Sequence, residues 1–121
     1  MNSVNIIGRI TGEPELRYTT SNIPVLSFRI AWNTKYRDKE ESHFFNVVAW
    51  RNNAEFIRNH FGKGDLIGIS GRLQQRSYEK DGEKRSVAEI LVQDVSFCGG
   101  KKKPQEIEDF QEAEEDGDVP F

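Results

Sequence analysis

Cysteine and histidine are scarce in this chain. Its 121 residues include one cysteine, Cys98, and two histidines, His43 and His60. A single cysteine cannot form a disulfide within the chain, which suits a reducing compartment. These residues have no metal-ligand spacing, and no Ser-His-Asp or Cys-His arrangement is evident. We therefore expect no metal, no cofactor and no catalytic residue, and hence a protein that is not an enzyme.

Long apolar runs are absent as well. No segment approaches the roughly 20 apolar residues that cross a bilayer. The first residues, Met1 to Asn5, lack the basic and apolar regions of a secretory signal, so we expect a cytoplasmic protein. The length allows one domain of about 100 residues and a tail.

Basic residues are missing from residues 104–121, which contain eight acids and carry a charge of −8. All 17 Lys and Arg residues lie in residues 1–103 with the other 12 acids, so that part carries +5. The overall charge of −3 hides this separation. A basic body suggests a polyanionic partner. The acidic segment from Glu106 has few apolar residues, and we expect it to be disordered.

Residues 42–50 form the clearest strand, because they are rich in β-branched and aromatic residues and lack Gly and Pro. Successive side chains of a strand point to opposite faces. Phe45, Val47 and Ala49 then share a face suited to a core. The opposite face carries Phe44, Asn46, Val48 and Trp50.

Similar patterns predict the other elements. Strands are expected at 4–10, 16–18, 25–32, 66–78 and 85–97, and a helix at 51–61 with Asn52 or Asn53 as its N-cap. Residues 35–41 are interpreted as a polar connection, and Asp81-Gly82 as a hairpin turn. Further core positions follow from alternation: Leu26, Phe28, Ile30, Ile67, Ile69 and Leu73.

The order of these elements predicts an all-β fold. Five main strands with one short helix between the third and fourth match the plan of an OB-fold, a five-stranded Greek-key barrel. The barrel would occupy residues 1–100, and residues 101–121 would form a short linker and an acidic C-terminal tail. An α+β sheet with one helix fits the same pattern and stays open as an alternative.

The faces turned away from the predicted core combine aromatic rings with cations. Bases of single-stranded nucleic acids stack on such rings, while guanidinium groups meet the phosphates. The rings predicted to stack on bases are Phe44, Trp50 and Tyr78. The residues predicted to contact the nucleic-acid backbone are Arg29, Lys35, Lys63, Arg72 and Arg76. Two alternatives stay open: an RNA-binding OB protein, and a protein-interaction domain in which these rings form an interface.

The C-terminal end is a separate motif. An acidic segment closes on an apolar end with a free carboxylate, a combination suited to a partner's pocket with a basic rim. The residues of this predicted partner-binding tip are Asp116, Asp118, Val119, Pro120 and Phe121.

Several segments together resemble one known family. The segments 5–10, 14–18, 44–50, 63–65 and 71–78, with the acidic tip, are similar to the bacterial and phage single-stranded DNA-binding proteins. The resemblance implies an OB-fold homotetramer that binds single-stranded DNA independently of sequence in replication, recombination and repair. It also implies a tip that recruits partner enzymes, a location at the nucleoid or in the cytoplasm of a phage host, and a base-stacking role for Tyr36.

Two departures from the family pattern bear on function. The linker before the tip is only about ten residues here, where family members commonly carry a long Gly- or Gln-rich one. The tip contains Gly117 within its acidic run and Val119 where Ile or Leu is usual. Since a buried CH₂ group is worth about 0.8 kcal/mol, we expect modestly weaker capture of partners.

Overall fold

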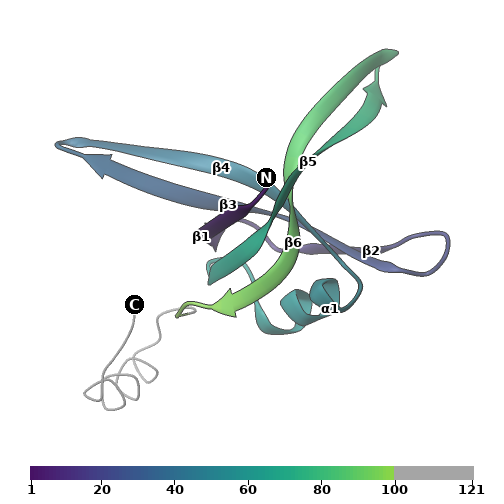
Figure 1. Cartoon of the computed structure of the whole chain (residues 1–121), viewed down its shortest axis with the longest axis horizontal. Helices are drawn as coiled ribbons and strands as arrows, with labels where there is room; N and C mark the ends of the chain where they lie inside the picture. Colours follow the sequence, from purple (N-terminus) through teal and green to yellow (C-terminus); the bar gives the residue numbers. More distant parts are fainter. Residues whose placement is uncertain (100–121) are drawn as a thin grey trace.

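The structure is a computed structural model that describes residues 1–99. The predicted linker and acidic tail, residues 101–121, lie outside the described residues. The elements in chain order are β1 (Val4–Ile10), β2 (Glu15–Tyr18), β3 (Pro24–Tyr36), β4 (Lys39–Trp50), α1 (Arg51–His60), β5 (Leu66–Lys80) and β6 (Glu83–Phe97) (Figure 1).

The sheet closes on itself as a barrel. Its strands lie in the order β1-β5-β6-β4-β3, and β1 also pairs with β3 through Arg9–Ala31 and Ile10–Ile30. All pairings are antiparallel except that between β4 and β6. Short β2 pairs only with β3, at the margin of the barrel. The prediction of a five-stranded OB barrel is confirmed, and the alternative of an α+β sheet with one helix is wrong.

The core fills the barrel and continues under the helix. Its fully buried side chains include Ile10, Leu26, Ile30 and Ile67 from the strands, and Ile57 from α1. Apolar residues of α1 recur at helical spacing, so one face of the helix packs on the barrel while its other residues face solvent. The helix thereby covers the apolar interior at one end of the barrel (Figure 1).

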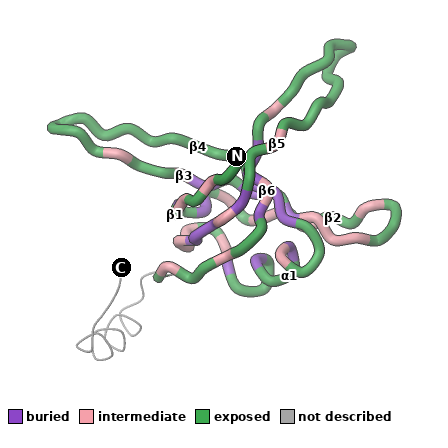
Figure 2. The backbone as a smooth tube through the Cα atoms, in the orientation of Figure 1, coloured by how far each residue is buried: buried purple, intermediate pink, exposed green. Residues whose placement is uncertain are grey.

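Two hairpins extend beyond the barrel as long arms (Figures 1 and 2). The β3–β4 ladder runs out to Tyr36 and Lys39, so the predicted polar connection at 35–41 is wrong: the turn is only Arg37-Asp38, and Arg37 has φ 59°. The predicted Asp81-Gly82 turn of the β5–β6 arm is confirmed, with φ values of 56° and 80°. These positive φ values are those of a tight hairpin turn that follows the twist of its strands.

Three burial predictions are wrong, and the arms explain two of them. Phe45 and Leu73 lie on the core-facing side of their strands, yet they are 37% and 52% exposed. Each sits near the base of an arm, where the barrel no longer covers that side. Val48 was expected outside but is only 6% exposed, because its strand is flanked by β3 and β6, with Ser27 and Leu91 as its register neighbours.

Two local features depart from or refine the prediction. Trp50, not Asn52 or Asn53, occupies the N-cap of α1, and it makes no side-chain capping hydrogen bond. Gly71 sits beside a register shift between β5 and β6, where a Cβ would overlap the carbonyl of Leu91. Glycine is needed there because the two backbones approach too closely for any side chain.

Candidate nucleic-acid interface

The outer surface of four neighbouring strands forms one continuous face. Residues paired across a ladder point to the same side, so the register shows which side chains share it. In β3 and β4, Arg29 pairs with Asn46 and Ala31 with Phe44. Strand β6 continues the face through the Val48–Leu91 pair, and β5 through its pairing with β6. We call this surface the outer face; its predicted site residues are Arg29, Lys35, Phe44, Trp50, Arg72, Arg76 and Tyr78.

On the β3–β4 half of the outer face, an arginine covers an aromatic ring. The guanidinium carbon of Arg29 lies 5.2 Å from the centre of the Phe44 ring, which is 51% exposed. Next to this pair, a groove of about 610 Å³ runs between residues 11–15 and the strands, lined by Ser27, Arg29 and Asn46. A flat ring, a cation and an open groove are thus adjacent here.

Trp50 lies at the end of β4, where the strand passes into α1. It pairs with Val25, and its side chain is 41% exposed on the outer face. It is six residues from Phe44 along the strand, a separation of roughly 20 Å. The two rings therefore offer separate positions along one strand.

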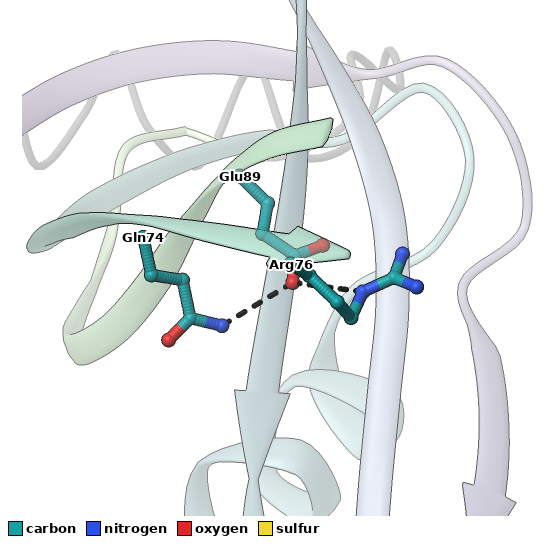
Figure 3. A network of polar contacts seen from close by, with 3 residues as sticks. All are labelled: Gln74, Arg76 and Glu89. Carbon is teal, nitrogen blue, oxygen red and sulfur yellow. Dashed lines mark hydrogen bonds and ion pairs between the residues drawn. The ribbon is translucent and has the colours of Figure 1, made fainter. Parts of the chain in front are cut away.

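On the β5–β6 half, Arg76 lies near the Tyr78 ring, with its guanidinium carbon 5.9 Å from the ring centre. The Nε of Arg76 also donates to Oε1 of Glu89 at 3.2 Å, and so does Nε2 of Gln74, also at 3.2 Å (Figure 3). Tyr78 is 40% exposed, whereas Glu89 is only 7% exposed. Arg72 lies further down the same face of β5, next to Leu91, and is exposed.

The tip of the β3–β4 arm presents Tyr36, the most exposed of the predicted rings at 69%. The guanidinium carbon of Arg37 lies 5.1 Å from the centre of its ring. Alternation along β3 puts Lys35 on the side of Phe44 and Arg29, and Tyr36 on the opposite side. The register thus does not bring Tyr36 together with Phe44 and Trp50.

Lys63 is also separate from the rest. It lies exposed in the turn between α1 and β5, beside Gly64, whose φ is 93° and whose carbonyl accepts a hydrogen bond from Arg9 Nη1 at 2.9 Å. Tyr78 lies towards the other end of β5, roughly 40 Å away along an extended strand. The predicted tip residues 116–121 lie outside the described residues.

Sequence reasoning missed two exposed aromatic features. Trp32 follows the same alternation along β3 as Phe28 and Ile30, but it is 43% exposed on the side of the β3–β4 arm opposite the outer face, with its ring 5.6 Å from that of His43. Phe97 is 63% exposed and stacks on Phe61 at a centroid distance of 5.0 Å. Only knowledge of where the barrel closes could have revealed the exposure of Trp32.

A second groove, of about 670 Å³, lies on the side of the barrel away from the outer-face rings. Trp32 and Phe45 of the β3–β4 arm line it together with Ile7 of β1. Ile7 is 54% exposed, so three large apolar side chains gather at one open surface.

Within residues 1–99, no group of three or more His, Cys, Asp or Glu side chains is placed to hold a metal ion. No helix of the described part is long and apolar enough to cross a membrane.

The profile of the single-strand binding protein family matches residues 1–98. This chain belongs to the single-strand binding protein family. The resemblance drawn from the motifs is thereby confirmed. The match covers all six strands and the helix, and so the whole outer face.

Curated relatives extend the match. The single-stranded DNA-binding protein of Aquifex aeolicus is 39% identical, over 99% of this chain and 82% of the relative. Single-stranded DNA-binding protein 3 of Clostridium acetobutylicum is 34% identical over the full length of both chains. The relative from Bacillus cereus is 42% identical, but the match spans only 59% of its length.

A solved structure shares the fold. A chain from the complex of a Plasmodium falciparum single-strand binding protein with single-stranded DNA superimposes with a TM-score of 0.74. The likeness covers 81% of this chain and 95% of that one, at 23% sequence identity. It supports the OB barrel described above.

Proposed function

We propose that this chain binds and coats single-stranded DNA without reading its sequence, and that it does so without catalysis. One observation carries the proposal: the outer face of β3, β4, β6 and β5 places exposed aromatic rings and arginines side by side. Stacking is tolerant of sequence because every base has a π-face, and arginine recognises the phosphate that every nucleotide carries. Membership of the single-strand binding protein family supports the same function.

The rings and the cations have different roles in this proposal. Phe44, Trp50 and Tyr78 stack bases along the outer face, and Tyr36 stacks a further base at the tip of the β3–β4 arm. Cations of the same face hold the DNA backbone, and Lys63 contacts a more distant part of the DNA strand. These backbone contacts are Arg29, Lys35, Arg72 and Arg76.

The protein acts as a homotetramer in this proposal. Ile7, Trp32 and Phe45 expose apolar surface around the second groove, on the side away from the outer-face rings. Burying such a patch against another copy of the chain would leave the outer face free for DNA. A solution mass, by sedimentation or light scattering, tests this: a monomer at working concentration contradicts it.

The C-terminal tip has a separate role. We propose that Asp116, Asp118, Val119, Pro120 and Phe121 recruit enzymes of replication, recombination and repair in the cytoplasm. The acids suit a basic rim, and the Phe ring suits an apolar pocket. In a pull-down with cell extract, deleting Phe121 should abolish the capture of partners. A separate titration with oligo-dT should show that the affinity for DNA is unchanged.

Tryptophan fluorescence tests the DNA-binding proposal directly. The chain has two tryptophans, Trp32 and Trp50, on opposite sides of the β3–β4 ladder. Titration of the Trp32→Phe variant with oligo-dT at low salt should quench the remaining Trp50 emission, because stacking places a base against that ring. An absence of quenching there, in a folded protein, rejects the proposal.

A competition experiment separates DNA from RNA. Poly-dT and poly-rU offer nearly the same stacking surfaces and phosphate spacing, so any preference reflects the sugar and the thymine methyl group. We expect poly-dT to displace a labelled oligo-dT at lower concentration than poly-rU does. A preference for poly-rU would instead favour an RNA-binding OB protein.

A further inference from the structure

Glu89 places a carboxylate in the middle of a face proposed to bind a polyanion. It lies on β6, which runs between β4 and β5, and its side chain is only 7% exposed. The Val47–Ile90 pair puts it level with Asn46 of β4, and on its other side it pairs with Gln74 of β5. Burying an ionised group is costly unless it is paired and hydrogen-bonded, and a negative charge here also repels phosphate. Such a residue needs a reason to be there.

The contacts of Glu89 supply that reason. Its Oε1 accepts a hydrogen bond from Gln74 Nε2 at 3.2 Å and another from Arg76 Nε at 3.2 Å (Figure 3). Both donors project from the same face of β5. The carboxylate thus fixes the inner end of an arginine whose side chain is otherwise 57% exposed.

The point of attachment matters for what Arg76 can still do. Glu89 engages Nε, and the two terminal nitrogens of the guanidinium point away from the carboxylate (Figure 3). These terminal N–H groups are free to form the paired hydrogen bonds with which arginine recognises phosphate. The guanidinium carbon also lies 5.9 Å from the centre of the Tyr78 ring, so the phosphate contact and the stacking ring are held together.

We propose that Glu89 is a positioning residue: it holds Arg76 by Nε beside Tyr78 and so pre-orients the terminal amines for the DNA backbone. The inference rests on the proposed binding of single-stranded DNA. Holding a long side chain in one geometry before binding reduces the entropy lost on binding, which is how a buried acid can favour capture of an anion.

The sign of the effect separates this proposal from simple electrostatics. Removing a negative charge from a phosphate-binding face should strengthen binding if charge alone matters. If Glu89 positions Arg76, Glu89→Ala should weaken binding of oligo-dT by about fivefold at 0.1 M salt and lower the salt slope by about 0.7, the values for one lost phosphate contact on a single strand. Affinity is measured by fluorescence titration of oligo-dT at several salt concentrations.

Matched variants isolate the cause. Glu89→Gln keeps an acceptor oxygen for Arg76 Nε, so it should restore binding to within about threefold of the parent protein. Glu79→Ala removes the same charge from the opposite face of β5, where Glu79 pairs with Lys84 in the ladder, and should not weaken binding. In an Arg76→Ala background, Glu89→Ala should cause no further weakening, since the residue it positions is gone.

Arg76→Lys tests the same idea without touching a buried residue, so it decides the question if Glu89→Ala fails to fold. Lysine keeps the charge, but its one nitrogen cannot pair with Glu89 and still leave two other nitrogens in fixed positions for a phosphate. The variant should bind as weakly as Arg76→Ala. Parent-like affinity of Arg76→Lys, or parent-like or tighter binding of a folded Glu89→Ala, overturns the positioning role while the parent still binds DNA. Failure of the parent itself to bind oligo-dT rejects the proposed function instead.

Discussion

The guanidinium carbon of Arg29 lies 5.2 Å from the centre of the Phe44 ring, one strand away on the outer face. The same kind of pair joins Arg76 to Tyr78 and Arg37 to Tyr36. A cation over an aromatic face is attracted by the ring quadrupole, so each of these arginines is held beside its ring. Within residues 1–99, Trp50 is the one predicted stacking ring without such an arginine.

Arg29 and Phe44 should therefore contribute to DNA binding together. Phe44→Ala should weaken binding of oligo-dT by about 1–3 kcal/mol, because one stacking surface is lost. Arg29→Ala should also weaken binding, and the double variant should lose less than the sum of the two, with a coupling of at least about 0.5 kcal/mol. Strictly additive losses in this double-mutant cycle would show that the two side chains bind DNA independently.

Trp50 is the next test of the outer face. Trp50→Ala should weaken binding by about 1–3 kcal/mol and leave the fold intact, since the side chain is 41% exposed. Trp50→Phe, which keeps a flat ring, should retain most of the affinity. Circular dichroism and thermal melting serve as controls for folding. Unchanged affinity in Trp50→Ala would assign this ring to an interface between subunits.

The tail should compete with DNA for the basic body. Residues 104–121 carry −8 against +5 in residues 1–103, so the tail is a polyanion in the same chain as the proposed polyanion-binding body. Deleting residues 106–121 should raise the affinity for oligo-dT, most strongly at low salt, where charges are least screened. A full-length chain with its tail acids changed to Asn and Gln should match the deletion. Equal affinity of the parent and truncated chains at every salt concentration would contradict competition.

Gly71 should be the glycine least tolerant of a side chain. Gly71→Ala places a Cβ against the carbonyl of Leu91 in the neighbouring strand, and such overpacking typically lowers the free energy of unfolding by about 1–3 kcal/mol. Gly12→Ala is the matched control, because a Cβ there meets no atom within 4 Å. Thermal or denaturant unfolding measures both. A Gly71→Ala variant as stable as Gly12→Ala would mean that β5 and β6 can separate at the register shift without loss.

Much of the outer face could be predicted because strand alternation is a local property. Side chains alternate at every residue of a strand, so the pattern around Phe44, Trp50 and Tyr78 already showed which side each one takes. The Asp81-Gly82 turn was equally readable, since its conformation depends on the two residues themselves. The separation of charge between body and tail needs no structure at all.

Burial, by contrast, depended on where the barrel closes. Phe45, Leu73 and Trp32 follow the core-facing alternation, but they lie where the arms have left the barrel, so nothing within residues 1–99 covers them fully. Tyr36 was assigned by family resemblance, and the register places it on the opposite side of the β3–β4 ladder from Phe44. These outcomes follow from contacts between distant segments, which no local pattern records.

The sequence by itself determined most of the strands, the Asp81-Gly82 turn, the charge of the tail and the sides on which Phe44, Trp50 and Tyr78 lie, because each follows from neighbouring residues. Only the tertiary structure decided that β6 runs between β4 and β5, and therefore that Glu89 is buried beneath an arginine of the proposed DNA-binding face. In the sequence, Glu89 is one acid among many. Strand pairing in the barrel brings Gln74 and Arg76 to Glu89, and these two donors determine the hydrogen bonds that its carboxylate accepts.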